Sequence, residues 1–240
     1  MRILFRLSEI ILVLMFALFN VACSQSPATG DGPKKSGFNI KSLAKSDIDE
    51  VLDIHVREVR GYLRELMVKL YKRNPRELKK SAYPDINQNI NRIFNQVHNW
   101  KFRELNNRKS IDALYLTFDE KYEGDRVFAF IAGLASMIMS SYGHKSDFYM
   151  LDTVEPQRLY NSARNIEIAV WKLENNLDSN GELFLYSNSL PGEPVNLSYE
   201  RLFGKLIATQ DTMSIIIANK TNRGIKKVIQ QMATAVFLPI

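Results

Sequence analysis

The sequence predicts an all-α protein, a helical bundle of about six to eight helices around a central apolar helix. The first observation is the stretch 127–142, which has no charged residue and is apolar on every side of a helix. The second is a pair of apolar seams whose residues recur at alternating spacings of four and three, as on one helix face. The seams run through Leu52, Val56, Val59, Leu63, Leu66 and Leu70, and through Leu159, Ala163, Ile166, Val170, Leu173 and Leu177.

The composition is that of an ordinary globular protein with a moderate positive charge. The chain has 240 residues, of which 45% are hydrophobic and 24% charged, and its formal net charge is +6. This length suits one good-sized domain. The charge suits an acidic partner or anionic head groups, but it is too weak to indicate nucleic acid. The single cysteine, Cys23, excludes an internal disulfide.

The first 23 residues have the layout of a secretory signal. Arg2 and Arg6 precede an apolar run from 10 to 19, which is too short for a comfortable membrane span. Val21, Ala22 and Cys23 follow, and this ending resembles the lipobox of bacterial lipoproteins. The residues by themselves also allow a plain secretory signal, or an uncleaved anchor with an incidental cysteine.

The resemblance implies that Cys23 becomes the first mature residue and carries the lipid, including palmitate. Ser24 stands where an aspartate is associated with inner-membrane retention, so the resemblance implies an outer-membrane anchor facing the periplasm. Residues 24–37 are rich in Ser, Gly and Pro, which favours a flexible tether. The expected organisation is a signal peptide (1–22), a lipidated cysteine with its tether (23–40) and a single helical domain (41–240).

Helix start and stop signals divide the first half of the domain. Ser46 is the expected N-cap of a long helix that ends at Asn74, and Pro75 begins a short one. Residues 84–100 have isoleucines on one side and predict an amphipathic helix. Residues 110–121 have a helical start signal, although their centre also tolerates a strand.

The second half begins with the central helix, 125–143. Gly133 and its small neighbours allow another helix to approach closely, and Gly143 suits the C-terminal end. Pro156 begins the helix of the second seam. Residues 178–194 predict a long surface loop, in which a short β-hairpin would fit and which we expect to be a contact site. Two helices, 198–219 and 221–237, complete the chain.

An excess of basic residues marks the segment 57–80, which has nine basic and three acidic residues. One interpretation is a solvated helix face. The other is a surface that contacts a partner, anionic lipid or cell-wall polymer. The candidate contact residues are Arg57, Arg60, Arg64, Lys72, Arg73 and Arg76.

No catalytic motif is assembled in the sequence. We expect His55 and His98 to pack on or cap helices, and His144 lies near serines but without the motifs of a serine hydrolase. The histidine spacings fall short of a metal site, so we expect no cofactor or metal. Acidic residues cluster before the central helix, where they either serve its dipole or act as acid and base on a glycan. They are Asp119, Glu120, Glu123 and Asp125.

The sequence therefore predicts an outer-membrane-anchored, periplasm-facing lipoprotein that acts as a non-enzymatic adaptor or assembly factor and binds an envelope protein. One alternative is a cell-wall-active enzyme that uses the acidic residues near 119–125. The other is a carrier whose apolar bundle binds a lipid. We expect no nucleic-acid partner.

Overall fold

Helices make up the regular structure of the residues that the computed structural model describes, 45–190 and 192–240. The predicted signal peptide, Cys23 and the tether lie outside the described residues. The described part contains seven α-helices, two short 3-10 helices and no β-strand, so the predicted all-α class is confirmed. The elements are α2 (Asp47–Arg73), α3 (Pro75–Lys80), α4 (Ile86–Phe94), η2 (Arg103–Leu105), α5 (Ile111–Thr117), α6 (Arg126–Ser141), α7 (Pro156–Asn175), α8 (Ser198–Thr221) and η3 (Met232–Thr234).

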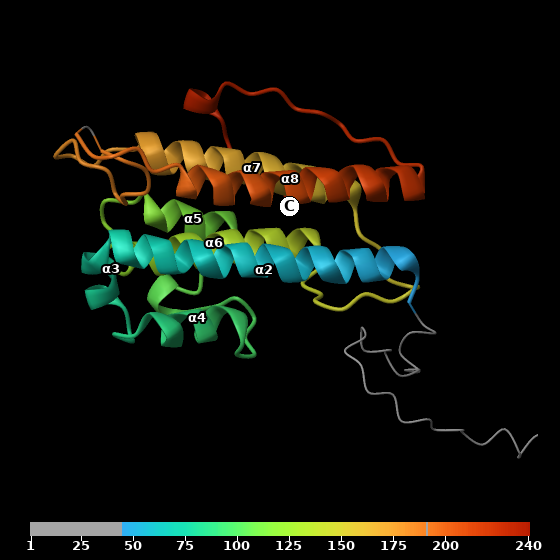
Figure 1. Ribbon diagram of the computed structural model, residues 1–240, viewed down its shortest axis with the longest axis horizontal. Coiled ribbons are helices and arrows are strands. Elements are labelled where there is room, and N and C mark those ends of the chain that lie inside the picture. The colour runs from blue at the N-terminus through green and yellow to red at the C-terminus, as the bar shows by residue number, and fades with distance from the viewer. Residues whose placement is uncertain (1–44, 191) are drawn as a thin grey trace, which may run out of the picture. The chain divides into compact units, whose positions relative to one another are not determined.

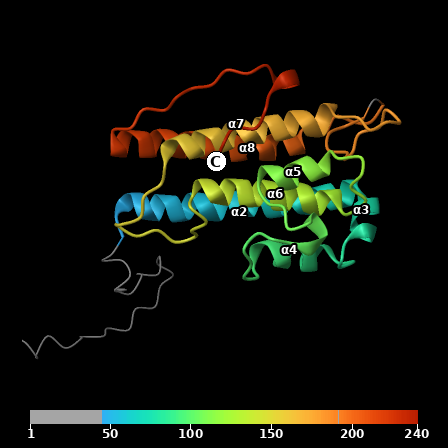
Figure 2. The same cartoon turned by 180° about the vertical axis from the view of Figure 1, so that it is seen from behind.

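The four long helices α2, α6, α7 and α8 pack in a ring. Helices α7 and α8 run side by side (Figures 1 and 2). Helix α2 packs against both α6 and α8, α7 also packs against α6, and α5 lies along α6. Helix α4 packs against α2 and α6, away from the α7–α8 pair. Ser46 is the N-cap of α2, as predicted, and the Asp49 carboxylate accepts a hydrogen bond from its backbone N–H at 2.7 Å.

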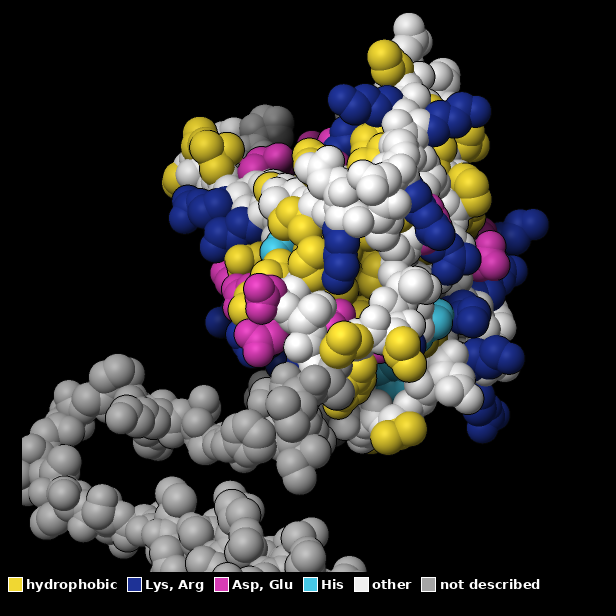
Figure 3. All heavy atoms as spheres, turned by 90° about the vertical axis from the view of Figure 1, so that its right-hand side faces the viewer, with side chains coloured by type: hydrophobic (Ala, Val, Ile, Leu, Met, Phe, Trp, Pro, Cys, Tyr) yellow, Lys and Arg dark blue, Asp and Glu magenta, His cyan; other side chains and the backbone are white. Residues whose placement is uncertain are grey.

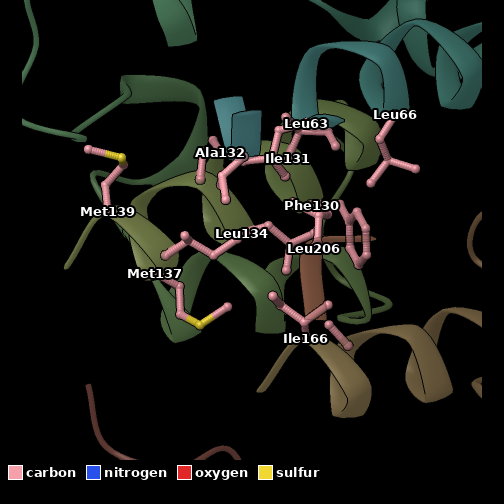
Figure 4. Close-up of a cluster of buried hydrophobic side chains, with 14 of the residues drawn as sticks. Leu63, Leu66, Phe130, Ile131, Ala132, Leu134, Met137, Met139, Ile166 and Leu206 are labelled. Atoms are coloured by element: carbon pink, nitrogen blue, oxygen red, sulfur yellow. The ribbon is translucent and has the colours of Figure 1, made fainter. Parts of the chain in front are cut away.

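Helix α6 is buried along almost its whole length. Every one of its residues except Ser140 is buried. Its side chains reach neighbours in several directions: Ile131 lies beside Leu63 of α2, while Met137 and Met139 point to opposite sides of α6 (Figure 4). Burial around the full circumference removes a large apolar area from water. Each Å² of this area stabilises the fold by about 25 cal/mol.

Helices α5 and α6 approach each other closely at Gly133. A Cβ atom added to Gly133 would lie 2.9 Å from the backbone nitrogen of Leu114 in α5, which is closer than any side chain tolerates. One turn further along, the Ser136 hydroxyl accepts a hydrogen bond from the Ser110 backbone N–H at 2.7 Å. The start of α5 is therefore held directly on the surface of α6.

A buried hydrogen-bond network joins α6, α7 and α8. Gln210 of α8 is fully buried, and its side-chain oxygen accepts a hydrogen bond from the Tyr142 hydroxyl at 2.6 Å. Its side-chain nitrogen donates to Ser162 of α7 and to Ser141 of α6. Burial raises the pKa of Tyr142, which keeps this hydroxyl a donor. Because Gln210 of α8 binds the end of α6 and the middle of α7 at once, the network specifies the register of the three helices.

The predicted helix 84–100 is too long, because α4 ends at Phe94. The following loop closes through His98, whose Nε2 donates to the Ile93 carbonyl at 2.8 Å. The Nδ1 atom of His98 accepts from the backbone N–H of Trp100 at 3.1 Å, and Trp100 has a positive φ of 59°. Val97 is left fully exposed. These bonds replace the helical ones beyond residue 94.

Two further segments differ in detail from the prediction. The segment 110–121 is helical only over α5. The loop 178–194 contains no strand among its described residues, and the short hairpin is not confirmed. Leu183 of this loop forms a single isolated antiparallel bridge with Leu177.

The predicted helix 221–237 is wrong. Helix α8 ends at Thr221, and Asn222 adopts a left-handed conformation with φ 52°. Residues 222–240, which we call the C-terminal strap, return along the α7–α8 pair and contain only the short η3 helix (Figure 1). Ile229, which suggested an amphipathic helix, is almost fully exposed.

Side chains of α7 satisfy the backbone of the strap in place of helical hydrogen bonds. Asn165 donates to the Leu238 carbonyl at 2.8 Å and accepts from the Leu238 N–H at 2.6 Å. Gln157 makes the same pair of bonds with Lys226, at 3.0 and 2.7 Å. These bonds join residues about 70 positions apart. A periodic pattern over a few turns of sequence therefore cannot predict them.

Replacing Gly133 with alanine should lower the free energy of unfolding by about 1–3 kcal/mol, because the methyl group overpacks the contact with Leu114. The matched control is Gly204→Ala in α8, where an added Cβ meets nothing within 4 Å. There the better helix propensity of alanine should stabilise the protein by up to about 1 kcal/mol. Urea denaturation measures both changes, and a stabilising Gly133→Ala would contradict the close approach.

Replacing Asn165 with alanine should cost about 1–3 kcal/mol, because both backbone groups of Leu238 lose their partner at a buried position. Hydrogen exchange should become faster in residues 236–240. Asn175→Ala, on the same helix but exposed, serves as the control and should leave exchange in the strap unchanged.

Candidate functional site

The acidic cluster before α6 does not form a common site. Glu120 and Glu123 are exposed, whereas Asp125 is buried. One Asp125 oxygen accepts from the Phe128 N–H at 2.9 Å and so caps α6, and the other accepts from the Tyr71 hydroxyl at 2.6 Å. Burial raises the pKa of Asp125 to about 6. The two hydrogen bonds oppose this rise, because they favour the charged form of the carboxylate.

Glu77 is a second carboxylate at the start of α6, and the sequence analysis did not identify it. It is 1% exposed, although it belongs to the short helix α3. One oxygen accepts from the Arg126 backbone N–H at 2.9 Å, and the other forms an ion pair with Lys80 at 2.9 Å. No local pattern could have identified it, because its main partner lies 49 residues away.

Arg126 is buried beside these carboxylates and binds backbone carbonyls. Its guanidinium donates to Thr117 at 2.8 Å, to Asp119 at 2.9 Å and to Tyr122 at 2.7 Å. Burial lowers the pKa of Arg126, and nearby Glu77 opposes this shift. The polar groups at this end of α6 therefore hold helix ends and a loop.

A pocket of about 360 Å³ opens in front of this cluster. Its lining combines three basic and three acidic residues with the loop that begins at Asp178. The charged lining residues are Arg76, Glu77, Lys80, Glu120, Arg126 and Asp178. Because the charges balance, the pocket favours neither anions nor cations.

A groove with a different character lies between α2, the loop after α4 and the loop after α6. Two adjoining pockets of about 390 and 360 Å³ form it, and they share Arg60 and Ser146. We call it the α2–α4 groove. Figure 3 shows basic, histidine and hydrophobic side chains lying next to one another at the lower right of this end of the protein. The lining includes Asp53, Arg57, Arg60, Arg64, Phe94, Val97, His98, Trp100, His144 and Asp147.

Three arginines of α2 line the groove without a carboxylate partner. Arg57, Arg60 and Arg64 form no ion pair with any described residue. Arg60 donates to the Phe94 carbonyl, and Arg64 donates to the Asn95 side-chain oxygen at 2.6 Å. Both acceptors are neutral, so the positive charge of the arginines is not balanced by these contacts.

Aromatic rings line the same groove. The Arg64 guanidinium lies 5.2 Å from the centre of the Phe94 ring, a distance typical of a cation–π contact. The His98 and Trp100 rings meet edge-on at 4.6 Å, and the Trp100 and His144 rings are 6.3 Å apart. Burial lowers the pKa of His144, and the charges of Lys109 and Arg158 lower it further. Both effects favour the neutral form of the His144 ring at this end of the groove.

The other predicted basic contact residues lie elsewhere. Arg73 pairs with Glu193 of the 178–194 loop, and Arg76 lies 5.5 Å from the Tyr186 ring of the same loop. Lys72 is exposed and has no polar contact with the described residues. The six predicted residues therefore divide into three that line the groove, two that hold the loop and one on the open surface.

The loop 178–194 is also held by a pair of carboxyl groups. The Asn188 side-chain nitrogen donates to Glu174 of α7 and, at 2.7 Å, to Glu200 of α8. Burial raises the pKa of Glu174 to about 7, and the neighbouring Glu200 raises it further toward that value. A hydrogen bond from Glu174 lowers the pKa of Glu200. The pair therefore shares one proton, which Glu174 holds because it is the more buried.

The described residues contain no group of three or more His, Cys, Asp or Glu side chains that could hold a metal ion. No helix in this part of the chain is long and apolar enough to span a membrane. The chain matches no protein-family model, and comparisons with curated proteins and with solved structures find no match.

Replacing Glu174 with glutamine should remove a pH dependence of stability. Because the folded-state pKa of Glu174 is raised from 4.5 to about 7, the native state holds a proton that the unfolded chain loses between these values. The free energy of unfolding should therefore fall as pH rises through this range. Glutamine keeps the acceptor for Asn188 and cannot lose a proton, so the variant should become more stable than the wild type toward about pH 8. The gain in the free energy of unfolding should be less than about 1 kcal/mol, because solvent screens a partly exposed group.

Urea denaturation at about pH 5 and about pH 8 measures this difference. Glu182→Gln makes the same change at an exposed position of the loop and should show no such gain. An equal difference at both pH values would show that the two carboxyl groups do not share a proton.

Proposed function

We propose that this protein is a lipid-anchored, non-enzymatic adaptor or assembly factor of the bacterial envelope. In this proposal the lipid on Cys23 holds the chain at the outer membrane, and the helical domain faces the periplasm. Helix α6 serves as the central helix of the bundle and gives α2 a rigid support. The α2–α4 groove, which α2 lines, binds a partner protein.

The observation that carries this proposal is the contrast between buried and exposed charges. Glu77, Asp125 and Arg126 are occupied by backbone groups and neighbouring side chains at the start of α6. The groove arginines, by contrast, have no carboxylate partner among the described residues. Arg60 and Arg64 lie over the Phe94 ring, and Arg60 lines the same pocket as Trp100. Arginine and aromatic side chains are enriched in the energetic centres of protein interfaces.

Photo-crosslinking in intact cells tests the proposal. A photoreactive residue replaces Val97, which is fully exposed in the groove, or Ile215, which is 56% exposed on α8. We expect one dominant crosslinked protein from position 97 and none of the same mass from position 215. Arg57→Glu should remove that product, whereas Lys72→Glu makes the same change of charge outside the groove and should not.

Two further variants separate the adaptor from its alternatives. Cys23→Ser should weaken the crosslink, because the anchor no longer concentrates the protein at the membrane. Glu120→Gln with Glu123→Gln should leave the crosslink and the cellular phenotype unchanged. Loss of the phenotype with an intact crosslink would instead favour a cell-wall-active enzyme that uses the pocket beside Glu120. Absence of a groove-specific product at position 97 would contradict the adaptor.

A further inference from the structure

We infer that the α2–α4 groove binds an acidic peptide segment that carries an apolar side chain next to its carboxylates. This inference rests on the proposed function, since it names the chemistry of the partner at the same site. The ligand is a stretch of another protein, extended or helical, whose carboxylates meet the arginines of α2. Its apolar side chain packs near Val97 and Trp100.

The charge of the groove arginines is unbalanced. Arg60 and Arg64 are one helical turn apart, and like charges at this spacing destabilise a helix. Burial lowers the pKa of Arg60, and the charge of Arg64 lowers it further. Asp53, the nearest acidic residue of the lining on the same helix, is already paired with Lys45. A ligand carboxylate would therefore relieve a repulsion that the described residues leave in place.

Two of the arginines have donors without a partner. The Nε atom of Arg64 has no hydrogen-bond acceptor among the described residues, although it is shielded from solvent in this structure. A guanidinium binds a carboxylate through two parallel N–H donors, and such paired contacts are among the strongest hydrogen bonds in proteins. Arg57 is exposed and has no polar contact with the described residues, so its whole guanidinium is available.

The arginines are evenly spaced along α2. Arg57, Arg60 and Arg64 are three and four residues apart on one helix, so successive arginines are separated by about 5–6 Å along the axis. Carboxylates three or four residues apart on a partner helix, or on every second residue of an extended segment, repeat at about the same interval. A peptide can therefore meet all three arginines at once.

An exposed valine lies at the aromatic end of the groove. Val97 is 104% exposed, and it lines the same pocket as the half-buried Trp100 ring. An exposed valine and an indole ring in one pocket are a suitable contact for one apolar side chain. The carboxylates of Asp53 and Asp147 also line the groove, which disfavours dense polyanions relative to a peptide with spaced charges.

Binding of defined peptides to the purified full-length protein in detergent tests this inference. The probe is a short fluorescein-labelled peptide of glutamates and leucines, and the reference peptide has glutamines in place of the glutamates. Fluorescence anisotropy should show affinity at least about tenfold higher for the acidic peptide, equivalent to about 1.4 kcal/mol. The affinity should fall as salt is added.

Variants locate the binding. Arg57→Glu and Arg64→Glu should each weaken the acidic peptide about tenfold, since a paired carboxylate contact is replaced by repulsion. Lys72→Glu should not weaken it. Val97→Ser should weaken the leucine-containing peptide more than a peptide of glutamate and serine. Arg57 and Val97 are exposed, so these variants keep the fold even where Arg64→Glu perturbs it.

Three results would overturn the inference: equal affinity for both peptides, an affinity unchanged by Arg57→Glu, or tighter Arg57-dependent binding to phosphatidylglycerol vesicles or polyphosphate. The outcomes are separable from those of the proposed function. If position 97 crosslinks to a partner but the acidic peptide does not bind, the proposed adaptor function is supported and the proposed acidic ligand is contradicted. Arginine-dependent peptide binding without a partner in cells supports the ligand chemistry and removes the adaptor.

Discussion

The burial of α6 on all sides is the constraint on which the rest of the structure depends. The first N–H groups of any helix and its last carbonyls lack partners within the helix, and in a buried helix water cannot replace them. Glu77 and Asp125 accept from the N–H groups of Arg126 and Phe128 at its start. At its end the chain turns through Gly143, with φ +65°. Helix α3 and the residue before α6 therefore supply the partners that the buried start of α6 requires.

The same constraint explains why the neighbours of α6 are so specific. Apolar contact alone would let α6 rotate among several packings, because its surface is apolar in every direction. The absence of a side chain at Gly133 admits α5 at one position only. The hydrogen bonds of Gln210 with Tyr142 and Ser162 align α8 with α6 and α7. The small Gly133 and the buried hydrogen bonds of Gln210 thus select one arrangement of the helices among the several that apolar contact alone would allow.

The ionisable groups fall into two sets: those that hold the fold together and those that remain available for binding. The buried ionisable groups near α6 are held by backbone partners, and the half-buried Glu174 and the exposed Glu200 hold the 178–194 loop through Asn188. The arginines on the outer face of α2 are different, because they meet neutral oxygens and aromatic rings. A surface that combines unbalanced charge, aromatic rings and an exposed valine is what the proposed partner binding uses.

The sequence by itself determined the all-α class and the positions of most helices, because apolar periodicity, the Ser46 cap and Pro156 act within one or two turns. Only the tertiary structure decided the extended strap, which Gln157 and Asn165 hold from about 70 residues away. It also decided which basic residues share a surface, since Arg60 and Arg64 meet the end of α4, whereas others meet a loop much later in the chain. The physical reason is that helix signals are local, whereas the partners of buried polar groups and of charges are brought together only by packing.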